Sequence, residues 1–240
     1  MWEGKLMKTE LARVSGLEIH RGTFSLQIDD WSLEPGEVVG LVGPNGAGKT
    51  TFLERLAGLR GSRSGQVSVF GRDPWADPTV REELGFMSDD MPLFTMRIGP
   101  LLRMLSGYYR NWDADLVESL LEKFKLDPHD KVHKLSKGQG TRLRLITAMA
   151  FRPRILLLDE PATGLDVMGR RTFLESVLDI VRDPGRSVMI SSHMLADVER
   201  VADRLLVLDG GKVVKKGRTD DLIGAKRTLE EALLDWGAGG

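Results

Sequence analysis

Three patterns of hydrophobic and polar positions follow one another along the chain, and each predicts its own kind of element. In residues 11–33 apolar and polar side chains alternate in places, as at Phe24, Leu26 and Ile28. A period of two is typical of strands that bury one face, and the Pro-Gly pair at 35–36 closes the segment with a turn. We therefore expect short antiparallel strands in the N-terminal region.

Short apolar runs predict further strands, because a parallel strand that is covered on both faces has no polar side. The predicted strands occupy residues 38–42, 66–70, 84–88, 155–158, 187–190, 205–208 and 212–216. The last two flank an Asp-Gly-Gly turn and are expected to form a hairpin. Helices are predicted over residues 51–56, 170–181, 196–202 and 228–236.

Residues 89–151 show a different pattern, in which helical spacing replaces the strand signals. Leu116 and Leu120 fall on one face of a helix that Asp113 can cap. Ser136 can cap a second helix, which ends before a proline. This stretch is expected to form a mainly helical sub-lobe between strands of the core.

The order of these elements predicts an α/β fold. Its sheet is mainly parallel, with antiparallel strands at the N-terminal end and an inserted helical sub-lobe. We expect one domain over residues 1–240, with residues 1–88 and 152–240 as its core and residues 89–151 as the sub-lobe. A chain of 240 residues that is 41% hydrophobic can bury a core of this size.

Charge and cysteine content exclude several classes of function. The formal net charge is −1, so the chain lacks the basic excess of a nucleic-acid-binding protein. It has no cysteine, which excludes disulfides, thiolate metal sites and cysteine nucleophiles. No apolar run approaches the ~18 residues that span a bilayer, and the N-terminal residues lack the apolar part of a signal peptide. We expect a soluble, intracellular chain that does not itself insert into a membrane.

The glycine-rich stretch GPNGAGKTT stands between a predicted strand and a predicted helix, which is the context of a phosphate-binding P-loop. Backbone N–H groups of such a loop and the N-terminus of the next helix favour an anion. Lys49 is expected to contact the β- and γ-phosphates, and the Thr50 hydroxyl to ligate Mg²⁺. The expected nucleotide-binding residues are Gly43, Pro44, Asn45, Gly46, Ala47, Gly48, Lys49, Thr50 and Thr51.

Two carboxylates, Asp159 and Glu160, directly follow the predicted strand at 155–158. Ligands of open α/β sheets bind outside the carboxyl ends of the strands, so both residues are expected near the P-loop. Asp159 is expected at Mg²⁺ opposite Thr50, and Glu160 is expected to orient or deprotonate the attacking water. His193 ends the following strand at the same edge and can contact the γ-phosphate or that water.

Taken together and in order, these motifs resemble those of the ATP-binding subunits of ABC transporters, over nearly the whole chain. GPNGAGKTT resembles the Walker A motif, LLLDEP the Walker B motif with its catalytic glutamate, and SSH the switch histidine. LSKGQ at residues 135–139 resembles the LSGGQ signature, and TGLD at 163–166 the D-loop. A signature followed by Walker B and TGLD is highly specific.

The resemblance implies a P-loop NTPase (RecA-like) core that uses ATP and Mg²⁺. It also implies that two subunits, identical or different, pair head to tail, with ATP between the Walker A loop of one and the signature of the other. The residues that would act in trans are Ser136, Lys137, Gly138 and Gln139, and Asp166 belongs to the D-loop. Ser136 would cap a helix whose N-terminus faces the γ-phosphate, while Lys137 either adds a cation there or points to solvent.

In this family ATP-driven closure of the dimer drives a transmembrane permease, so the resemblance places the chain on the inner face of the cell membrane through that partner. The segment YYRNWD at 108–113, the LSKG signature and the acidic pair at 89–90 look most like bacterial single-domain ATPases of export-type transporters. An exporter subunit is therefore the favoured function.

Two positions depart from the family pattern. The family normally has a glutamine after the strand occupied here by residues 84–88, whereas this chain has Asp89, whose shorter, charged side chain is expected to reach Mg²⁺ through water. The family also places an aromatic residue upstream that stacks on adenine. His20 is nearest that position by its distance from Lys49, and Phe24 is the alternative, but the favoured interpretation of Phe24 is a core strand residue.

Two other functions are weaker fits. Soluble ABC-type ATPases that act on nucleic acid or the ribosome usually carry tandem cassettes, coiled-coil insertions, zinc cysteines or basic extensions. This sequence has one cassette, no cysteine, no long heptad run and a balanced charge. A P-loop kinase or GTPase is disfavoured because the guanine-binding motif N-K-x-D is absent and LSKGQ would have no role.

Overall fold

A computed structural model describes residues 10–92, 94–224 and 228–237, with side chains up to residue 233. The prediction that a signal peptide is absent concerns mainly residues 1–9, which lie outside these ranges. None of the described helices is long and apolar enough to cross a membrane.

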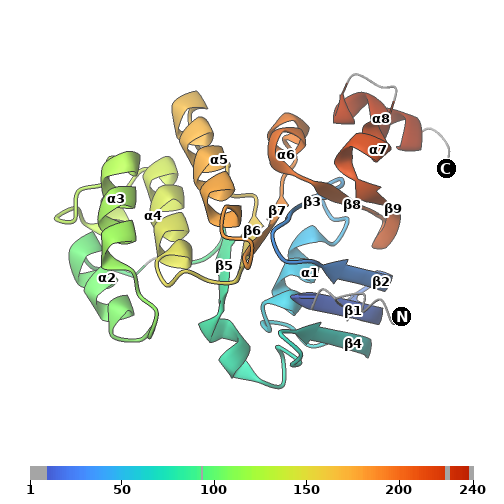
Figure 1. Cartoon of the computed structure of the whole chain (residues 1–240), viewed down its shortest axis with the longest axis horizontal. Helices are drawn as coiled ribbons and strands as arrows, with labels where there is room; N and C mark the ends of the chain where they lie inside the picture. The colour runs from blue at the N-terminus through green and yellow to red at the C-terminus, as the bar shows by residue number, and fades with distance from the viewer. Residues whose placement is uncertain (1–9, 93, 225–227, 238–240) are drawn as a thin grey trace, which may run out of the picture.

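Nine strands form one curled sheet in the order β4-β1-β2-β9-β8-β3-β7-β6-β5 (Figure 1). Five of the eight pairings between these strands are parallel, and the pairings β1–β2, β1–β4 and β8–β9 are antiparallel. The strands are β1 (Ala12–Arg21), β2 (Phe24–Leu33), β3 (Val38–Val42), β4 (Ser64–Val69), β5 (Leu84–Ser88), β6 (Ile155–Asp159), β7 (Ser187–Ser191), β8 (Arg204–Asp209) and β9 (Lys212–Arg218). The predicted α/β class is confirmed.

The described helices lie around this sheet, and α2, α3 and α4 gather at one end of the molecule, on the left of Figure 1. They come between β5 and β6 in the chain, in the stretch predicted to be helical. The helices are α1 (Lys49–Leu56), α2 (Ile98–Ser106), α3 (Ala114–Phe124), α4 (Lys137–Met149), α5 (Val167–Val181), α6 (Leu195–Val201), α7 (Thr219–Ile223) and α8 (Leu229–Gly237), with short 3₁₀ helices η1 (Pro78–Glu82) and η2 (Val132–Lys134).

Both predicted caps in the sub-lobe are present. The carboxylate of Asp113 accepts a hydrogen bond from the backbone N–H of Leu116 at 2.8 Å and starts α3. Ser136 starts α4 in a capping box with Gln139, which satisfies two backbone N–H groups that the helix leaves unpaired. The start of the signature helix is therefore set by the signature sequence itself.

Some boundaries differ from the predictions. Helix α5 begins at Val167 rather than at residue 170, because the Asp166 carboxylate accepts from the backbone N–H of Gly169 at 2.6 Å and caps it. Helices α2 and α7 were not predicted individually. A proline in the first turn obscures the apolar spacing of α2, which is Ile98, Leu101 and Leu102. Helix α7 has only five residues, too few for a periodic pattern.

Two apolar clusters pack against opposite faces of the sheet. On β3 the fully buried side chains alternate between them: Val38 and Val42 join the cluster that includes α3, α4 and α5, while Val39 and Leu41 join the cluster with α1, β1 and β2. Because β3 is packed on both faces, it cannot shift along the sheet without disturbing both clusters. The loop that follows β3 therefore starts from a rigid strand end.

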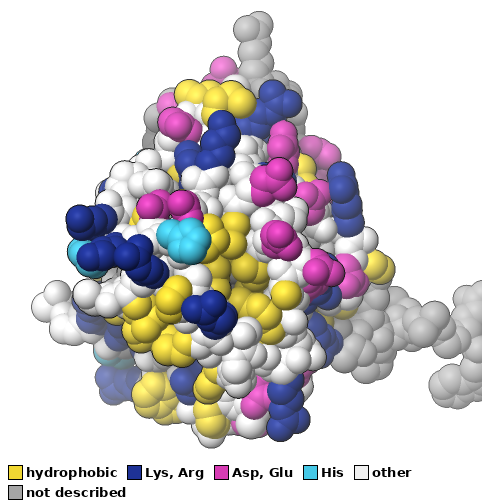
Figure 2. Space-filling view, turned by 90° about the vertical axis from the view of Figure 1, so that its left-hand side faces the viewer, with side chains coloured by type: hydrophobic (Ala, Val, Ile, Leu, Met, Phe, Trp, Pro, Cys, Tyr) yellow, Lys and Arg dark blue, Asp and Glu magenta, His cyan; other side chains and the backbone are white. Residues whose placement is uncertain are grey.

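The sub-lobe end of the molecule has an uneven surface (Figure 2). Hydrophobic side chains gather near the centre of this face, with basic side chains mainly on one side of them and acidic side chains mainly on the other. A polar rim around an apolar centre is the usual composition of a surface that contacts another protein.

Candidate active site

The loop between β3 and α1 bends through three glycines with positive φ, which are +148° at Gly43, +82° at Gly46 and +107° at Gly48. A Cβ atom at Gly43 would lie 2.0 Å from the carbonyl oxygen of Leu208, so no larger residue fits there. Left-handed residues within such a turn are typical of loops whose N–H groups form an anion-binding nest. The predicted P-loop therefore has the backbone that its chemistry needs.

Lys49, the first residue of α1, is only 7% exposed. Its ammonium group donates hydrogen bonds to the carbonyl oxygens of Gly43 at 2.7 Å and Pro44 at 3.1 Å. Burial lowers the pKa of Lys49, while the negative charges of Glu160 and Asp159 act in the opposite direction. The cation is thus held against the loop, within the electrostatic influence of the predicted catalytic residue Glu160 and the predicted Mg²⁺ residue Asp159.

A chain of hydrogen bonds holds Asp159 in a fixed orientation. The Thr50 hydroxyl donates to one carboxylate oxygen of Asp159 at 2.7 Å, and the Ser191 hydroxyl donates to the other at 2.6 Å. Asp159 and Ser191 pair in register at the ends of β6 and β7. No role of its own was predicted for Ser191. The available signal was its position, at the end of the strand that follows the Asp-Glu strand.

Glu160 and His193 form a second pair at the same edge. Oε2 of Glu160 lies 2.6 Å from Nδ1 of His193 and accepts the backbone N–H of His193 at 3.3 Å. Glu160 has a φ of +50°, and its own N–H donates to the Ser191 hydroxyl at 3.0 Å. A left-handed conformation at a non-glycine residue costs energy and is common at functional sites. The contact of His193 with a phosphate or water stays a prediction.

Six of the predicted site residues, which come from separate parts of the chain, line one open, polar pocket of about 260 Å³. They are Asn45, Thr50, Asp89, Asp159, Glu160 and His193. The pocket lies at the carboxyl ends of β5 and β6, beside the P-loop. Asp89, which follows β5, is one of its walls. The lining residues are Asn45, Thr50, Ser88, Asp89, Asp90, Asp159, Glu160, Thr163 and His193.

The donor set fits magnesium. Among the described residues, no group of three or more His, Asp or Glu side chains is placed to hold a metal ion by itself. Mg²⁺ does not need one, since it usually takes one or two protein oxygens and completes its shell with phosphates and water. The Thr50 hydroxyl and the Asp159 carboxylate, 2.7 Å apart, provide that minimal oxygen set beside the P-loop.

The signature sequence occupies the exposed first turn of α4. The Ser136 hydroxyl accepts the N–H of Gln139 at 3.3 Å, and the Gln139 side chain accepts the N–H of Ser136 at 2.9 Å. Further along α4 the Thr141 hydroxyl donates to the carbonyl oxygen of Thr163 at 3.2 Å. Within one chain, therefore, the signature helix packs against the TGLD segment.

Lys137 and Asp89 have a contact that the sequence did not predict. The Lys137 ammonium lies 2.9 Å from a carboxylate oxygen of Asp89 in the same chain. Lys137 was expected to face a partner's phosphate or solvent, and in the single chain it forms this ion pair instead. The predicted link of Asp89 to Mg²⁺ through water stays a prediction.

The two candidates for adenine stacking have different surroundings. His20 is exposed at the end of β1 and lies 2.7 Å from the carboxylate of Glu18. Phe24 is half-buried beside the P-loop, where a Cβ atom at Gly48 would lie 3.1 Å from its ring. Phe24 is thus the aromatic ring next to the loop, although stacking on adenine stays a prediction for both residues.

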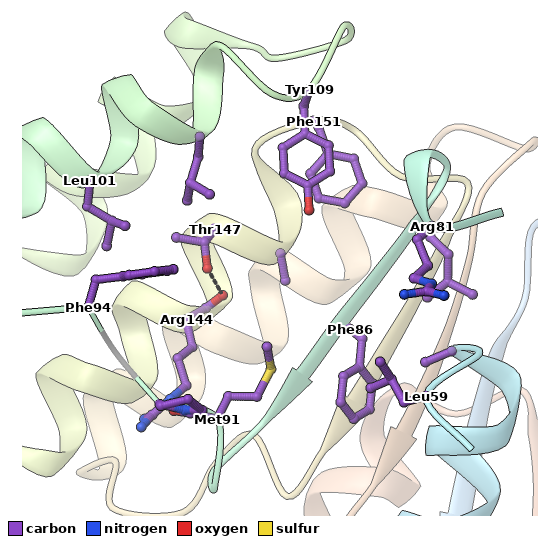
Figure 3. Close-up of a pocket in the computed structure, with 15 residues that line it drawn as sticks. Leu59, Arg81, Phe86, Met91, Phe94, Leu101, Tyr109, Arg144, Thr147 and Phe151 are labelled. Carbon is purple, nitrogen blue, oxygen red and sulfur yellow. Dashed lines mark hydrogen bonds between the residues drawn. The ribbon is translucent and has the colours of Figure 1, made fainter. Parts of the chain in front are cut away.

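A second, apolar groove of about 240 Å³ lies between the sheet and the sub-lobe (Figure 3). Phe94 and Leu101 line one side, Phe86 and Leu59 the opposite side, and Met91 extends between them. Phe94 is 55% exposed and Leu59 50%. Since the chain segment that begins at the active-site pocket with Asp89 continues into this groove, the two sites share one loop.

Comparison with known protein families matches residues 26–163, more than half of the chain, to ABC transporter. The chain belongs to this family. The matched region includes the P-loop, the signature and the Asp159–Glu160 pair, and it contains all the residues that line the pocket except His193.

Two curated relatives and one solved structure illustrate the similarity. The chain is 35% identical over 201 residues to the Nod factor export ATP-binding protein I of Rhizobium etli, which covers 80% of this chain and 62% of that protein. It is 34% identical over 225 residues to the daunorubicin/doxorubicin resistance ATP-binding protein DrrA of Streptomyces peucetius, covering 89% and 67%. The structure of an ATP-binding subunit of an ABC transporter matches with a TM-score of 0.87 at 26% identity, over 95% of this chain and 99% of that one. The ABC ATP-binding family and its fold are confirmed.

Proposed function

We propose that this ABC protein hydrolyses ATP to ADP and phosphate, that it powers a separate membrane permease, and that the transport is export. The observation that carries the proposal is that three features of an ATP site lie in one pocket or directly beside it. They are a buried cation at the P-loop, an oriented carboxylate beside a hydroxyl for Mg²⁺, and a second carboxylate held by a histidine. The names of both relatives, which refer to export and to drug resistance, support export as the direction of transport.

Each side chain then has a defined task. Lys49 attracts the β- and γ-phosphates, while Thr50 and Asp159 would hold Mg²⁺, which lowers the charge on the phosphates when it is bound. Glu160 accepts a proton from the attacking water, as the water oxygen bonds to the γ-phosphorus and the bond to ADP breaks. His193, 2.6 Å from Glu160, keeps that carboxylate aimed.

The proposed unit is a head-to-tail dimer, with a second copy or a similar chain as partner. The first turn of α4 is exposed, and its cap at Ser136 leaves N–H groups and the positive end of the helix dipole for a phosphate. A γ-phosphate bound to the P-loop of the partner would complete this half of the site. ATP would therefore act as part of the interface.

The apolar groove is the proposed contact with the permease. Its walls are aromatic and aliphatic, and Arg81 and Arg144 stand at its edges, which suits an amphipathic segment from the cytoplasmic side of a membrane protein (Figure 3). Arg144 also donates to the carbonyl oxygen of Met91 at 2.8 Å and so ties the groove to the loop that begins at Asp89. Movement of this loop with nucleotide state would reach the permease.

In this proposal residues 1–240 work as one ABC ATPase domain, with residues 89–151 as the sub-lobe that carries the signature and most of the permease contact. The protein would lie in the cytoplasm, at the inner face of the cell membrane, attached through the permease. The P-loop supplies the ATP-binding surface, and no nucleic acid takes part.

The test uses co-expression with the permease of a neighbouring reading frame. Phe94→Glu places a charge in the groove and should abolish co-purification of the permease, while nucleotide binding by the isolated subunit stays normal. Leu178→Glu is the matched control, since Leu178 is also an exposed apolar residue, 41% exposed, but lies on α5 away from the groove. If the permease is recovered equally with both variants, the groove is not the permease contact. If the unchanged subunit does not hydrolyse ATP, the proposed function as a whole is rejected.

A further inference from the structure

Two of the positions where this chain leaves the ABC motifs contact each other. Lys137 stands inside the signature, where a glycine is usual, and Asp89 stands where a glutamine is usual. Their charged groups are 2.9 Å apart, with 60% of the Lys137 side chain and 27% of the Asp89 side chain exposed. One departure thus supplies a negative charge at the active-site pocket, and the other supplies the cation that neutralises it.

The stem of Lys137 is also placed by the fold. A Cβ atom at Gly164 would lie 3.0 Å from Cγ of Lys137, so the stem runs across this residue of the TGLD segment, which has a φ of +79°. Gly138 packs equally closely, because a Cβ there would lie 2.7 Å from the Gly164 carbonyl oxygen. The side chain of Lys137 therefore links three motifs: the signature, the TGLD segment and the loop after β5.

The charges around the pocket would allow Lys137 to leave Asp89 and pair with another anion. Asp89 shares the pocket with Asp159 and Glu160, so an unpaired Asp89 would add to the repulsion of a triphosphate. An ion pair whose lysine is mostly exposed to water is weak, and a phosphate group carries more charge than a carboxylate. A phosphate that approaches the first turn of α4 would therefore compete well for Lys137.

We propose that Lys137 exchanges one anion for another: it pairs with Asp89 of its own chain while the site is open, and with the nucleotide phosphate of the partner subunit when the dimer closes. Lys137 would thereby link the state of a subunit's own pocket to the signature surface that the subunit presents to its partner. The inference rests on the proposed head-to-tail dimer. Its consequence is that the effects of changing Asp89 and Lys137 on dimer closure depend on each other.

A double-mutant cycle measures that dependence. Asp89→Asn and Lys137→Met remove the charges and keep most of the shape, and both are placed, singly and together, in a Glu160→Gln background that holds ATP. Light scattering gives the ATP concentration at half-maximal dimerisation. Asp89→Asn should lower this midpoint, because Lys137 is released, and Lys137→Met should raise it. The effect of Asp89→Asn should differ by about threefold or more between proteins with and without the Lys137→Met change, as expected for contacting residues.

The charge-exchanged variant, Asp89→Lys with Lys137→Asp, separates exchange from a merely structural pair. It restores an ion pair within the chain, so urea unfolding without nucleotide should match that of the parent. It also places a carboxylate at the signature, so ATP-driven dimerisation should be lost. Recovery of both properties would overturn the exchange and leave only a surface ion pair.

A matched control uses Arg171 and Glu175, an exposed ion pair with a 3.0 Å separation on α5. The cycle of Arg171→Met and Glu175→Gln should show additive effects on the ATP midpoint. Additive effects in the Asp89–Lys137 cycle as well would overturn the exchange while leaving the proposed function intact. If the Glu160→Gln parent fails to dimerise with ATP, the proposed dimer itself is rejected, and the exchange with it.

Discussion

The two halves of the proposed ATP site are built differently. In the half at the P-loop, Lys49, Asp159 and Ser191 are buried. Hydrogen bonds between neighbouring strands and α1 hold the side chains of this half, as in the chain from Thr50 through Asp159 to Ser191. The signature half is exposed at the start of α4, and among the described residues Lys137 has a single charged contact, with Asp89. One half is thus fixed before nucleotide arrives, whereas the other can still change its contacts.

This difference follows from where each half lies. Strands β3, β6 and β7 are fully buried, so their ends cannot move without disturbing both apolar clusters. Helix α4 belongs to the sub-lobe, which joins the core partly through the loop after β5. A fixed half suits chemistry, which needs accurate distances, and an adjustable half suits a step that must open and close.

The largest effect is expected in the fixed half. Lys49→Ala removes the main side-chain cation from a site built for anions, so nucleotide affinity should fall by about a hundredfold or more, as for the loss of a buried charged hydrogen bond. Titration with a fluorescent ATP analogue measures this loss. Arg171→Ala, which removes an exposed cation on α5, is the control and should leave binding by the single subunit nearly unchanged. Near-normal affinity of Lys49→Ala would reject the P-loop assignment.

Glu160→Gln should separate chemistry from binding. The amide keeps the shape of the side chain but cannot accept the proton, so ATP turnover should fall by about 10²–10⁴-fold, the usual contribution of a general base. Loss of the negative charge also reduces repulsion of the triphosphate, so the variant should accumulate as an ATP-bound dimer in light scattering. A variant that stays monomeric while the unchanged protein dimerises would contradict this role for Glu160.

Ser136→Arg tests the adjustable half. A bulky side chain replaces the cap of α4 where a partner's phosphate is expected, so dimer closure with ATP should be blocked. Binding of ATP to the single subunit should stay within about twofold of normal, because additivity holds for sites that share no contacts. Weakened binding by the monomer would show that the signature acts on its own chain's nucleotide.

The fixed half was largely predictable from the sequence. The P-loop is a continuous motif between a strand and a helix, and the positions of Asp159 and His193 follow from strand ends that meet at one edge of a sheet. Ser191 escaped notice because its contact with Asp159 depends on the register of β6 and β7, which the sequence does not specify. The contact of Glu160 with His193 likewise depends on how the two loops after these strands turn toward each other.

The adjustable half was only partly predictable. The cap at Ser136 is local, so the sequence was sufficient for it. The pairing of Lys137 with Asp89 joins two residues far apart in the chain, and it depends on how the sub-lobe sits against the sheet. Counting back from Lys49 favoured His20 for adenine, but the ring beside the P-loop belongs to Phe24, because the β1–β2 hairpin brings the first residue of β2 against Gly48.

The smallest and most specific effect is expected at Asp89, where the two halves meet. Its charge should attract Mg²⁺ through water and repel the γ-phosphate, so the site should depend on Mg²⁺ more steeply than a glutamine site. Asp89→Gln should keep ATPase activity with a weaker dependence on Mg²⁺. Asp89→Ala should lower activity a fewfold, a loss of about 1 kcal/mol that is typical of one hydrogen bond.

ATPase rates across a Mg²⁺ titration, for the unchanged protein and both variants, compare these expectations directly. Because Lys137 neutralises Asp89 in the open state, the difference between the Mg²⁺ curves should widen when Lys137→Met is added. A wider difference would show that the Asp89 carboxylate affects both the Mg²⁺ dependence of ATP hydrolysis and the signature residue Lys137. If the Mg²⁺ curves of the unchanged protein and both Asp89 variants superimpose, Asp89 belongs to the solvated surface. The fixed half then consists of the P-loop and the ends of β6 and β7 alone.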